Sequence, residues 1–260
     1  YLGYLRTPAD FDNSDWIGTY YNDAGIGTPG SHRGYRRYLG DAVPAYNNPG
    51  WTLNEQVNSS DVTRFILAPE VMYKWAKNSN FIARVGYDES SDRRITYFPW
   101  RSASSNSNGA FADNLIRESE LSLHLINQSN HKLTKDLNLN ATLGYLATDR
   151  NFYSIGGSAL NFIIRDQDRY GFFNSTSENM TPFNSVSRVL NNRFYGTFDF
   201  AFQDKVFLNL GTAAEQSSTF ADRFYSPSAS LSYEFTKDII IPTLSYGKLR
   251  VLWGQVGVAP

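Results

Sequence analysis

Hydrophobic and polar residues alternate along several segments of this chain. In the segment FYSPSASLSYEF, residues 224–235, Tyr225, Leu231 and Phe235 stand at odd positions, whereas serines and Glu234 fill the even positions from Ser226 onward. Side chains of an extended strand point alternately to its two faces. The segment therefore predicts a strand with one apolar face and one polar face.

The same alternation predicts seven further strands. The eight candidates lie in residues 62–75, 81–88, 118–127, 137–147, 194–204, 206–211, 224–235 and 247–255. No segment between them has a sustained apolar period of 3.6 residues, which is the signal of an amphipathic helix. We therefore predict an all-β, antiparallel fold.

The links between these strands differ in length. Residues 77–80, 128–136, 203–205 and 237–243 form short links, residues 98–114 and 151–187 form long polar ones, and the link at 218–224 is brief. Short turns at one end and long loops at the other are typical of a transmembrane β-barrel, with periplasmic turns and extracellular loops. A soluble β-sandwich shows the same alternation.

The positions of the aromatic residues favour the membrane alternative. Ten of them cluster near strand ends, as the aromatic girdles of membrane barrels do. They are Tyr73, Trp75, Phe81, Tyr97, Phe98, Trp100, Phe152, Tyr153, Tyr225 and Trp253. The apolar faces are therefore expected to lie against outer-membrane lipid, and the polar faces against a lumen.

Composition excludes several other classes. The 260 residues carry a net charge of -1, which gives no electrostatic reason to expect nucleic acid as a partner. No apolar run is long enough for a membrane-spanning helix. Cysteine is absent, so disulfides and thiolate metal sites are excluded.

Enzyme signatures are weak. The stretch GIGTPG, residues 25–30, fits a dinucleotide-binding glycine pattern, but no strand precedes it and Pro29 suits a turn. The three histidines lack metal-ligand spacing. Glu118 and Glu120 share one strand face, where a hydrated lumen wall is the simpler interpretation. We predict no enzyme activity, no catalytic residue, no metal and no cofactor.

Two segments carry residues that are expected to contact a substrate. The first runs from residue 16 to 51, and the second from 152 to 183, in a loop long enough to fold over a barrel mouth. Aromatic rings pack on sugars or peptide side chains, and arginines hold carboxylates. The candidates are Trp16, Tyr20, Tyr21, Arg33, Arg36, Arg37, Trp51, Tyr170 and Phe172. Both segments have a simpler alternative, in which the first loop packs on itself and the second on a partner protein.

Several segments resemble one family. NNPGWTLNEQVNSSDVTRF (47–65), FYSPSASLSYEFTKD (224–238) and LSYGKLRVLWGQVG (244–257) resemble barrel segments of the SusC-like TonB-dependent outer-membrane transporters of Bacteroidota. YLRTPADFDN (4–13) is similar to a segment that precedes them in some members. VFLNLGTAAEQSSTF (206–220) is similar to a family strand and loop, and departs from its usual sequence at Ala213 to Gln216.

The resemblance implies a part of a larger molecule. Members of the family have an N-terminal plug inside a barrel of about 22 strands. Residues 1–61 then form an extracellular loop region and 62–258 about eight transmembrane strands, with no plug domain in this chain. A sheet with unpaired edges is not tolerated in lipid, so further strands are expected.

The resemblance also implies a function. The full protein would import oligosaccharides or peptides across the outer membrane of a Gram-negative bacterium. A SusD-like surface lipoprotein would be its partner, and the missing N-terminal part would contact the TonB-ExbB-ExbD complex. Two alternatives stay open: a soluble or surface-exposed all-β carbohydrate-binding module, and a structural subunit of a larger envelope complex.

Overall fold

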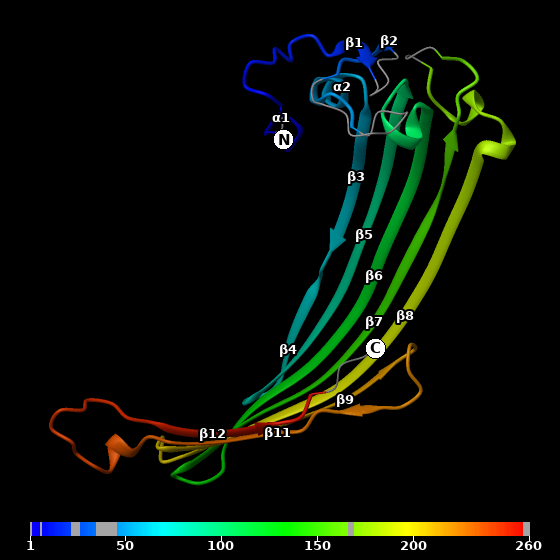
Figure 1. Ribbon diagram of the computed structural model, residues 1–260. Helices are drawn as coiled ribbons and strands as arrows, with labels where there is room; N and C mark the ends of the chain where they lie inside the picture. The colour runs from blue at the N-terminus through cyan, green and yellow to red at the C-terminus, as the bar shows by residue number, and fades with distance from the viewer. Residues whose placement is uncertain (1, 6, 22–26, 35–45, 166–168, 257–260) are drawn as a thin grey trace. The chain divides into compact units, whose positions relative to one another are not determined.

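The computed structural model describes residues 2–5, 7–21, 27–34, 46–165 and 169–256 (Figure 1). Its helical elements are short: α1 (Leu2–Leu5), α2 (Pro49–Asn54), η1 (Ser104–Asn106), η2 (Phe172–Asn174), η3 (Ser177–Asn179) and η4 (Phe235–Lys237). None of the helices in these residues is both long and apolar enough to cross a membrane.

Strands make up most of the described chain. They are β1 (Ile17–Tyr21), β2 (Gly27–His32), β3 (Val57–Leu67), β4 (Glu70–Ala76), β5 (Ser79–Trp100), β6 (Asn108–Lys132), β7 (Leu137–Leu160), β8 (Met180–Phe202), β9 (Val206–Ser217), β10 (Phe224–Tyr225), β11 (Ser228–Tyr233) and β12 (Leu249–Gly254). The predicted all-β antiparallel fold is confirmed.

Ten of these strands form one sheet, and β1 and β2 form a separate hairpin. The sheet order is β12-β11-β9-β8-β7-β6-β5-β3, with β4 also paired to β5 and β10 also paired to β9. Neighbours in the sheet are therefore mostly neighbours in sequence. If β3 is joined with β4 and β10 with β11, the ten strands reduce to the eight that the alternation predicts.

The first predicted strand differs from the observed one in two ways. It begins at Val57, earlier than the predicted Val62, and it is interrupted between β3 and β4. Pro69 lies at the interruption and has no backbone N–H to donate to a partner strand. Its carbonyl still accepts a hydrogen bond from the Val85 N–H, at 3.1 Å, so the chain stays beside β5.

The central strands are much longer than predicted. β5, β6, β7 and β8 contain 22, 25, 24 and 23 residues and run side by side in sheet order (Figure 1). The two long loops expected at 98–114 and 151–187 shrink to 101–107 and 161–179, because the strands continue into both segments. The shorter links, at 77–78, 133–136 and 203–205, lie at the other ends of these strands.

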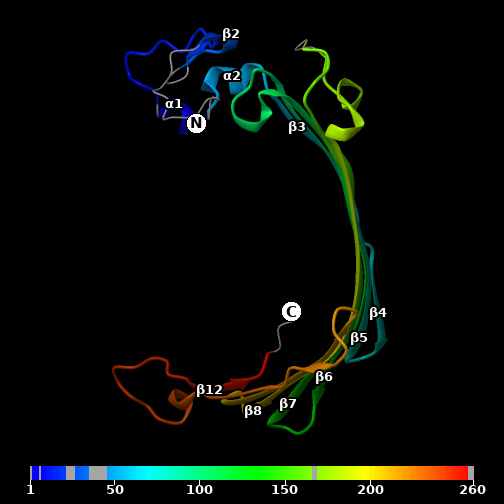
Figure 2. The same cartoon turned by 45° about the vertical axis from the view of Figure 1, so that its right-hand side comes forward.

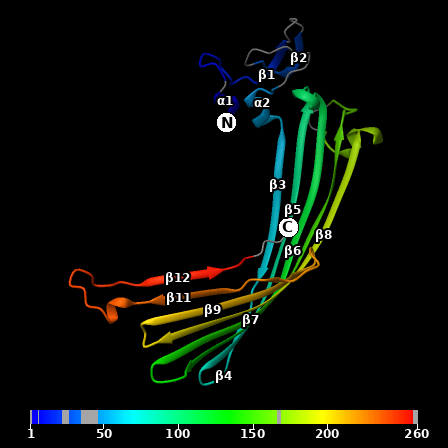
Figure 3. The same ribbon diagram turned by 60° about the horizontal axis from the view of Figure 1, so that its bottom comes forward.

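The pairing of β8, β9, β11 and β12 confirms the predicted two faces. Phe198 and Leu210 stand opposite each other, and Leu231 stands between Leu208 and Val251. On the other face, Asp199 stands opposite Asn209, which pairs with Ser230. Figure 3 shows β9, β11 and β12 as neighbouring antiparallel strands, coloured from yellow to red.

The described residues divide into two compact units. Unit 1 combines residues up to 63 with 91–117 and 153–186, and unit 2 combines 64–90, 118–152 and 187–256. In unit 1, α2 leads directly into β3 (Figure 2). A small aromatic core of Tyr97, Phe111 and Phe162 holds the strands of unit 1, and Phe172 packs against it.

Candidate functional site

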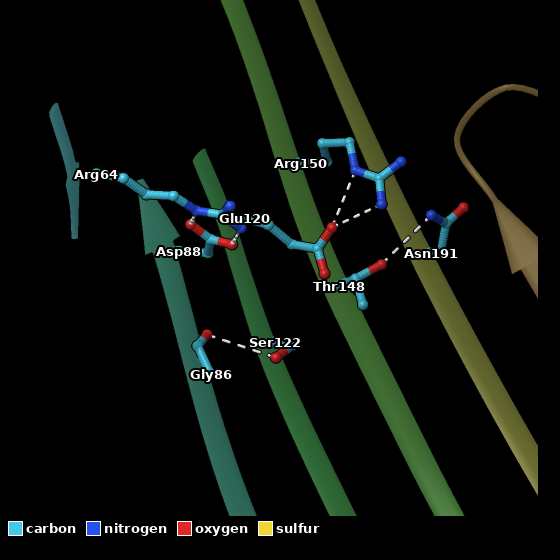
Figure 4. Close-up of polar contacts among 8 residues, drawn as sticks. All are labelled: Arg64, Gly86, Asp88, Glu120, Ser122, Thr148, Arg150 and Asn191. Atoms are coloured by element: carbon cyan, nitrogen blue, oxygen red, sulfur yellow. Dashed lines mark hydrogen bonds and ion pairs between the residues drawn. The ribbon is translucent and has the colours of Figure 1, made fainter. Parts of the chain in front are cut away.

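A set of polar side chains crosses the strands of unit 2 on one face (Figure 4). Arg64 binds Asp88 through two hydrogen bonds of 2.9 and 2.5 Å, which join β3 to β5. Arg150 binds one oxygen of Glu120 at 3.0 and 2.6 Å, which joins β7 to β6. Between these pairs, the Ser122 hydroxyl donates to the Gly86 carbonyl at 3.4 Å. We call this the polar face of unit 2.

The polar face continues onto β8 and β9. Asn191 donates to the Thr148 hydroxyl at 3.3 Å, and Arg193 forms an ion pair with Glu215 at 2.9 Å. Near the turn between β8 and β9, Asn209 donates to Asp199. The cations and anions of these ion pairs come from neighbouring strands, so the face is strongly polar while these charges are paired.

An aromatic ring spans two strands of this face. The Tyr195 hydroxyl lies 2.8 Å from His124 Nε2, so the side chain of β8 reaches across β7 to β6. Gly144 of β7 lies beneath the ring. A Cβ atom at that position would lie 2.1 Å from the ring of Tyr195, so only glycine leaves room for this contact.

The opposite face of unit 2 is apolar and exposed. Phe194, Leu231 and Val251 have exposed fractions of 62%, 51% and 74%. We call it the apolar face. Ion pairs occur at its margin, where Arg188 binds Asp149 through hydrogen bonds of 2.9 and 2.7 Å.

The predicted contact residues near the N-terminus take part in internal packing. Trp16 Nε1 donates to Glu55 at 2.8 Å. The Arg33 guanidinium donates to the carbonyls of Asp12 and Asp15, at 3.0 and 3.3 Å. Tyr20 and Tyr21 lie in β1, but their side chains are outside the description, and Arg36 and Arg37 lie outside the described residues.

Trp51 is fully buried, which does not fit the predicted contact with a ligand. Its Nε1 donates to the Ser102 hydroxyl at 3.2 Å, and its ring lies edge-on to His32. The Asn48 N–H donates to His32 Nδ1 at 3.2 Å, and burial lowers the pKa of His32 to about 4. Trp51 and His32 therefore hold the loop region together as neutral, enclosed side chains.

The second predicted segment packs on the strands of unit 1. Tyr170 stacks on Tyr97 with ring centroids 4.5 Å apart, and Phe172 meets Phe111 edge-on at 5.1 Å. The loop thus covers one face of the strands. Its expected position over a barrel mouth stays a prediction.

Two of the cavities bordered by described residues have polar side chains in their lining. One, of about 520 Å³ in unit 1, lies beside Phe172 and Gly157 and has the Arg93–Asp113 ion pair in its lining. The other, of about 320 Å³ in unit 2, lies on the polar face at Arg193 and Glu215. Of their lining residues, only Phe172 in the first cavity was among the contacts predicted from the sequence. For the second cavity, the sequence did carry one indication: residues Ala213 to Gln216, which include Glu215, depart from the family pattern.

No three side chains among the described His, Cys, Asp and Glu residues gather in a way that would hold a metal ion. The residues at hand are amides, hydroxyls, paired charges and aromatic rings. These groups can bind and orient polar molecules.

No protein-family model and no curated protein matches the sequence. Among solved structures, the chain is similar to the RagAB peptide importer in the closed-closed state, with a TM-score of 0.73 and 16% identity over 93% of this chain and 29% of that chain. The open-open state of the importer gives a TM-score of 0.74 at 16% identity, covering 93% of this chain and 28% of that one. A further structure of the RagAB peptide transporter has a TM-score of 0.74 at 16% identity, covering 93% of this chain and 29% of that chain.

This similarity concerns the fold. The chain spans less than a third of the chains that it matches. RagA is SusC-like, so the resemblance that the sequence segments indicated is confirmed at the level of the fold. RagB, which accompanies RagA in those structures, is a SusD-like lipoprotein.

Proposed function

We propose that this chain forms part of the barrel wall of a TonB-dependent outer-membrane importer of oligosaccharides or peptides. The fold similarity to the RagAB importer supports a transport role. We assign the chain no chemical step, because the groups that it presents suit binding and passage. Its location would be the outer membrane of a Gram-negative bacterium of the Bacteroidota.

One observation carries this proposal: the sheet of unit 2 has two faces of opposite character. Exposed Phe194, Leu231 and Val251 stand on one face, and ion-paired Arg150 and Arg193 on the other. Soluble proteins rarely expose an apolar surface this continuous. Lipid on one side and a hydrated lumen on the other satisfy both faces at once.

Strand length fits the same proposal. A tilted strand needs about 9 to 11 residues to cross the hydrocarbon core. β9 has 12 residues, close to that length, whereas β6 has 25. The additional residues of β6 would extend beyond the membrane, on the side of the longer links, which we place outside the cell.

The partners follow from this assignment. A SusD-like lipoprotein would cover the extracellular side, as RagB accompanies RagA. Energy would come from the TonB-ExbB-ExbD complex through a part of the protein outside this chain. The contact residues predicted from the sequence, apart from the buried Trp51, stay proposed substrate contacts on the extracellular side.

Paired substitutions on β11 test the proposal. Leu231→Arg places a charge on the apolar face and should lower the free energy of unfolding by about 2 to 4 kcal/mol, the cost of a cation near the bilayer midplane. Ser230→Arg places the same side chain on the polar face and should cost far less. Both are measured by urea unfolding of the full-length protein in phospholipid vesicles.

Equal costs for the two substitutions would contradict the assignment of the faces. A full-length protein that is monomeric and soluble without detergent would contradict the membrane location itself, and would favour the soluble binding module.

A further inference from the structure

The smaller cavity lies entirely within unit 2 and is lined by three adjacent strands. Thr148 comes from β7, Asn191 and Arg193 from β8, and Glu215 and Ser217 from β9. All five side chains belong to the polar face. Phe220 and Phe224, from the segment that links β9 to β11, complete the lining. The volume of about 320 Å³ is at the lower end of the range for small-molecule pockets.

The segment that closes the cavity is fixed in place. The Ser218 N–H donates to the Leu190 carbonyl at 2.8 Å, and the Leu190 N–H donates to the Ser218 hydroxyl at 3.0 Å. Phe220 and Phe224 meet edge-on with ring centroids 4.5 Å apart. Phe224 also stands opposite Glu215 in the pairing of β10 with β9. The aromatic side of the cavity is therefore preorganised, which lowers the entropy cost of binding.

The polar side of the cavity offers donors and acceptors next to each other without a net charge. Arg193 and Glu215 form an ion pair at 2.9 Å, yet their side chains are 49% and 38% exposed. Asn191 and Thr148 add an amide and a hydroxyl, joined at 3.3 Å. Planar guanidinium, carboxylate and amide groups each bind two neighbouring ligand atoms.

We propose that this cavity is a binding subsite for a neutral sugar ring. The hydroxyl groups of a sugar donate and accept side by side, as the Arg193, Glu215 and Asn191 groups require, and the apolar ring face packs on Phe220 or Phe224. A charged ligand suits the cavity less well, because it would compete with one partner of the ion pair and leave the other charge unpaired.

The subsite rests on the proposed function, since a sugar reaches the polar face of unit 2 only if that face lines a lumen. It deepens that function by assigning a position in the wall where a passing oligosaccharide would be held. None of the residues expected from the sequence to contact substrate belongs to it.

A matched pair of arginine substitutions tests the subsite. Arg193→Gln removes the charged donor of the cavity, whereas Arg188→Gln removes an ion-paired arginine of the same strand that lies outside it. Binding of maltotriose, xylotriose and trialanine to the detergent-purified full-length protein is measured by titration calorimetry. Arg193→Gln should weaken binding of a trisaccharide by about tenfold or more, the usual loss for a charged hydrogen bond, and Arg188→Gln by less than about twofold.

A second measurement reports occupancy of the cavity at saturating ligand instead of affinity. The chain contains no cysteine, so single cysteines report their own surroundings. Saturating trisaccharide should slow alkylation of Asn191→Cys, in the cavity, and leave Ser177→Cys, in the link between β7 and β8, unchanged. Thermal unfolding of each variant in detergent checks that the fold is retained.

The outcomes separate the subsite from the transport function. The subsite is overturned if Arg193→Gln leaves trisaccharide binding unchanged, or if a bound trisaccharide does not protect Asn191→Cys from alkylation. In either case, uptake assays on cells still test the transport function. Protection by trialanine alone overturns the sugar assignment. Protection by a trisaccharide that cells fail to take up supports the subsite and contradicts the proposed importer.

Discussion

At the scale of single residues, Gly144 shows how the absence of a side chain on one strand allows contact between the two strands beside it. Tyr195 reaches His124 only because nothing projects from β7 beneath its ring. The hydrogen bond thereby connects β6 with β8 in addition to the backbone pairing of each strand with β7. One glycine thus lets side chains tie three neighbouring strands together.

Gly144→Ala should lower the free energy of unfolding by about 1 to 3 kcal/mol, the usual cost of overpacking, because the new methyl group displaces the Tyr195 ring. Tyr195→Phe is the control that keeps the ring and loses only the hydrogen bond, at about 1 kcal/mol. Urea unfolding in vesicles measures both. A Gly144→Ala protein as stable as the wild type would show that the ring does not rest on this glycine.

At the scale of elements, the alternation predicted the parts of the long strands that lie in unit 2 and missed the parts that lie in unit 1. Along residues 108–117 of β6, Phe111, Asp113 and Leu115 share one face, and Asn114 and Ile116 the other. Both faces mix polar and apolar residues, so no period of two is visible. The physical reason is packing. Phe162 and Phe172 cover one face of the strands in unit 1, so the side chains of that face contact other protein residues and are not selected for one solvent.

The candidate residues of the loops were harder to predict than the strands. Composition identified Trp51 and Arg33 as aromatic and cationic, but the same residue types also build the interior of a loop. Only the contacts distinguish the two uses: Trp51 bonds to Ser102 and Arg33 to backbone carbonyls. By residue type alone, nothing in the sequence around Arg193 or Glu215 indicated a binding site. The cavity arises only when the two residues pair across β8 and β9.

The region of β2 and α2 should respond to pH through His32. Its pKa is lowered to about 4 by burial, against about 6.5 in an unfolded chain. Above pH 6.5 both states are neutral, so stability is unaffected. As the pH falls from 6.5 to 4, the unfolded state takes up the proton first, and the region should lose up to about 3 kcal/mol.

Hydrogen exchange of the Trp51 segment, followed from pH 7 to pH 4, measures this loss. His32→Phe should remove most of the pH dependence, because no proton is then taken up on opening. Equal pH dependence in the two proteins would assign the effect to other groups.

At the scale of the whole molecule, the links at the two ends of the strands should face opposite sides of the membrane. Lys135 lies in a short link and Ser177 in the longest one, and both are exposed. On intact cells, a membrane-impermeant thiol reagent should label Ser177→Cys and reach Lys135→Cys only after the outer membrane is opened. Labelling of both on intact cells would rule out the two-sided arrangement.

The proline between β3 and β4 has a consequence for assembly. Within the described residues β3 is the last strand in the sheet order, and β4 also pairs only with β5. Pro69 turns its carbonyl to β5 and, as a proline, has no N–H, so the strand is interrupted at this point between β3 and β4. An edge divided into two shorter strands, β3 and β4, offers a second chain no continuous row of backbone groups, which disfavours pairing between chains.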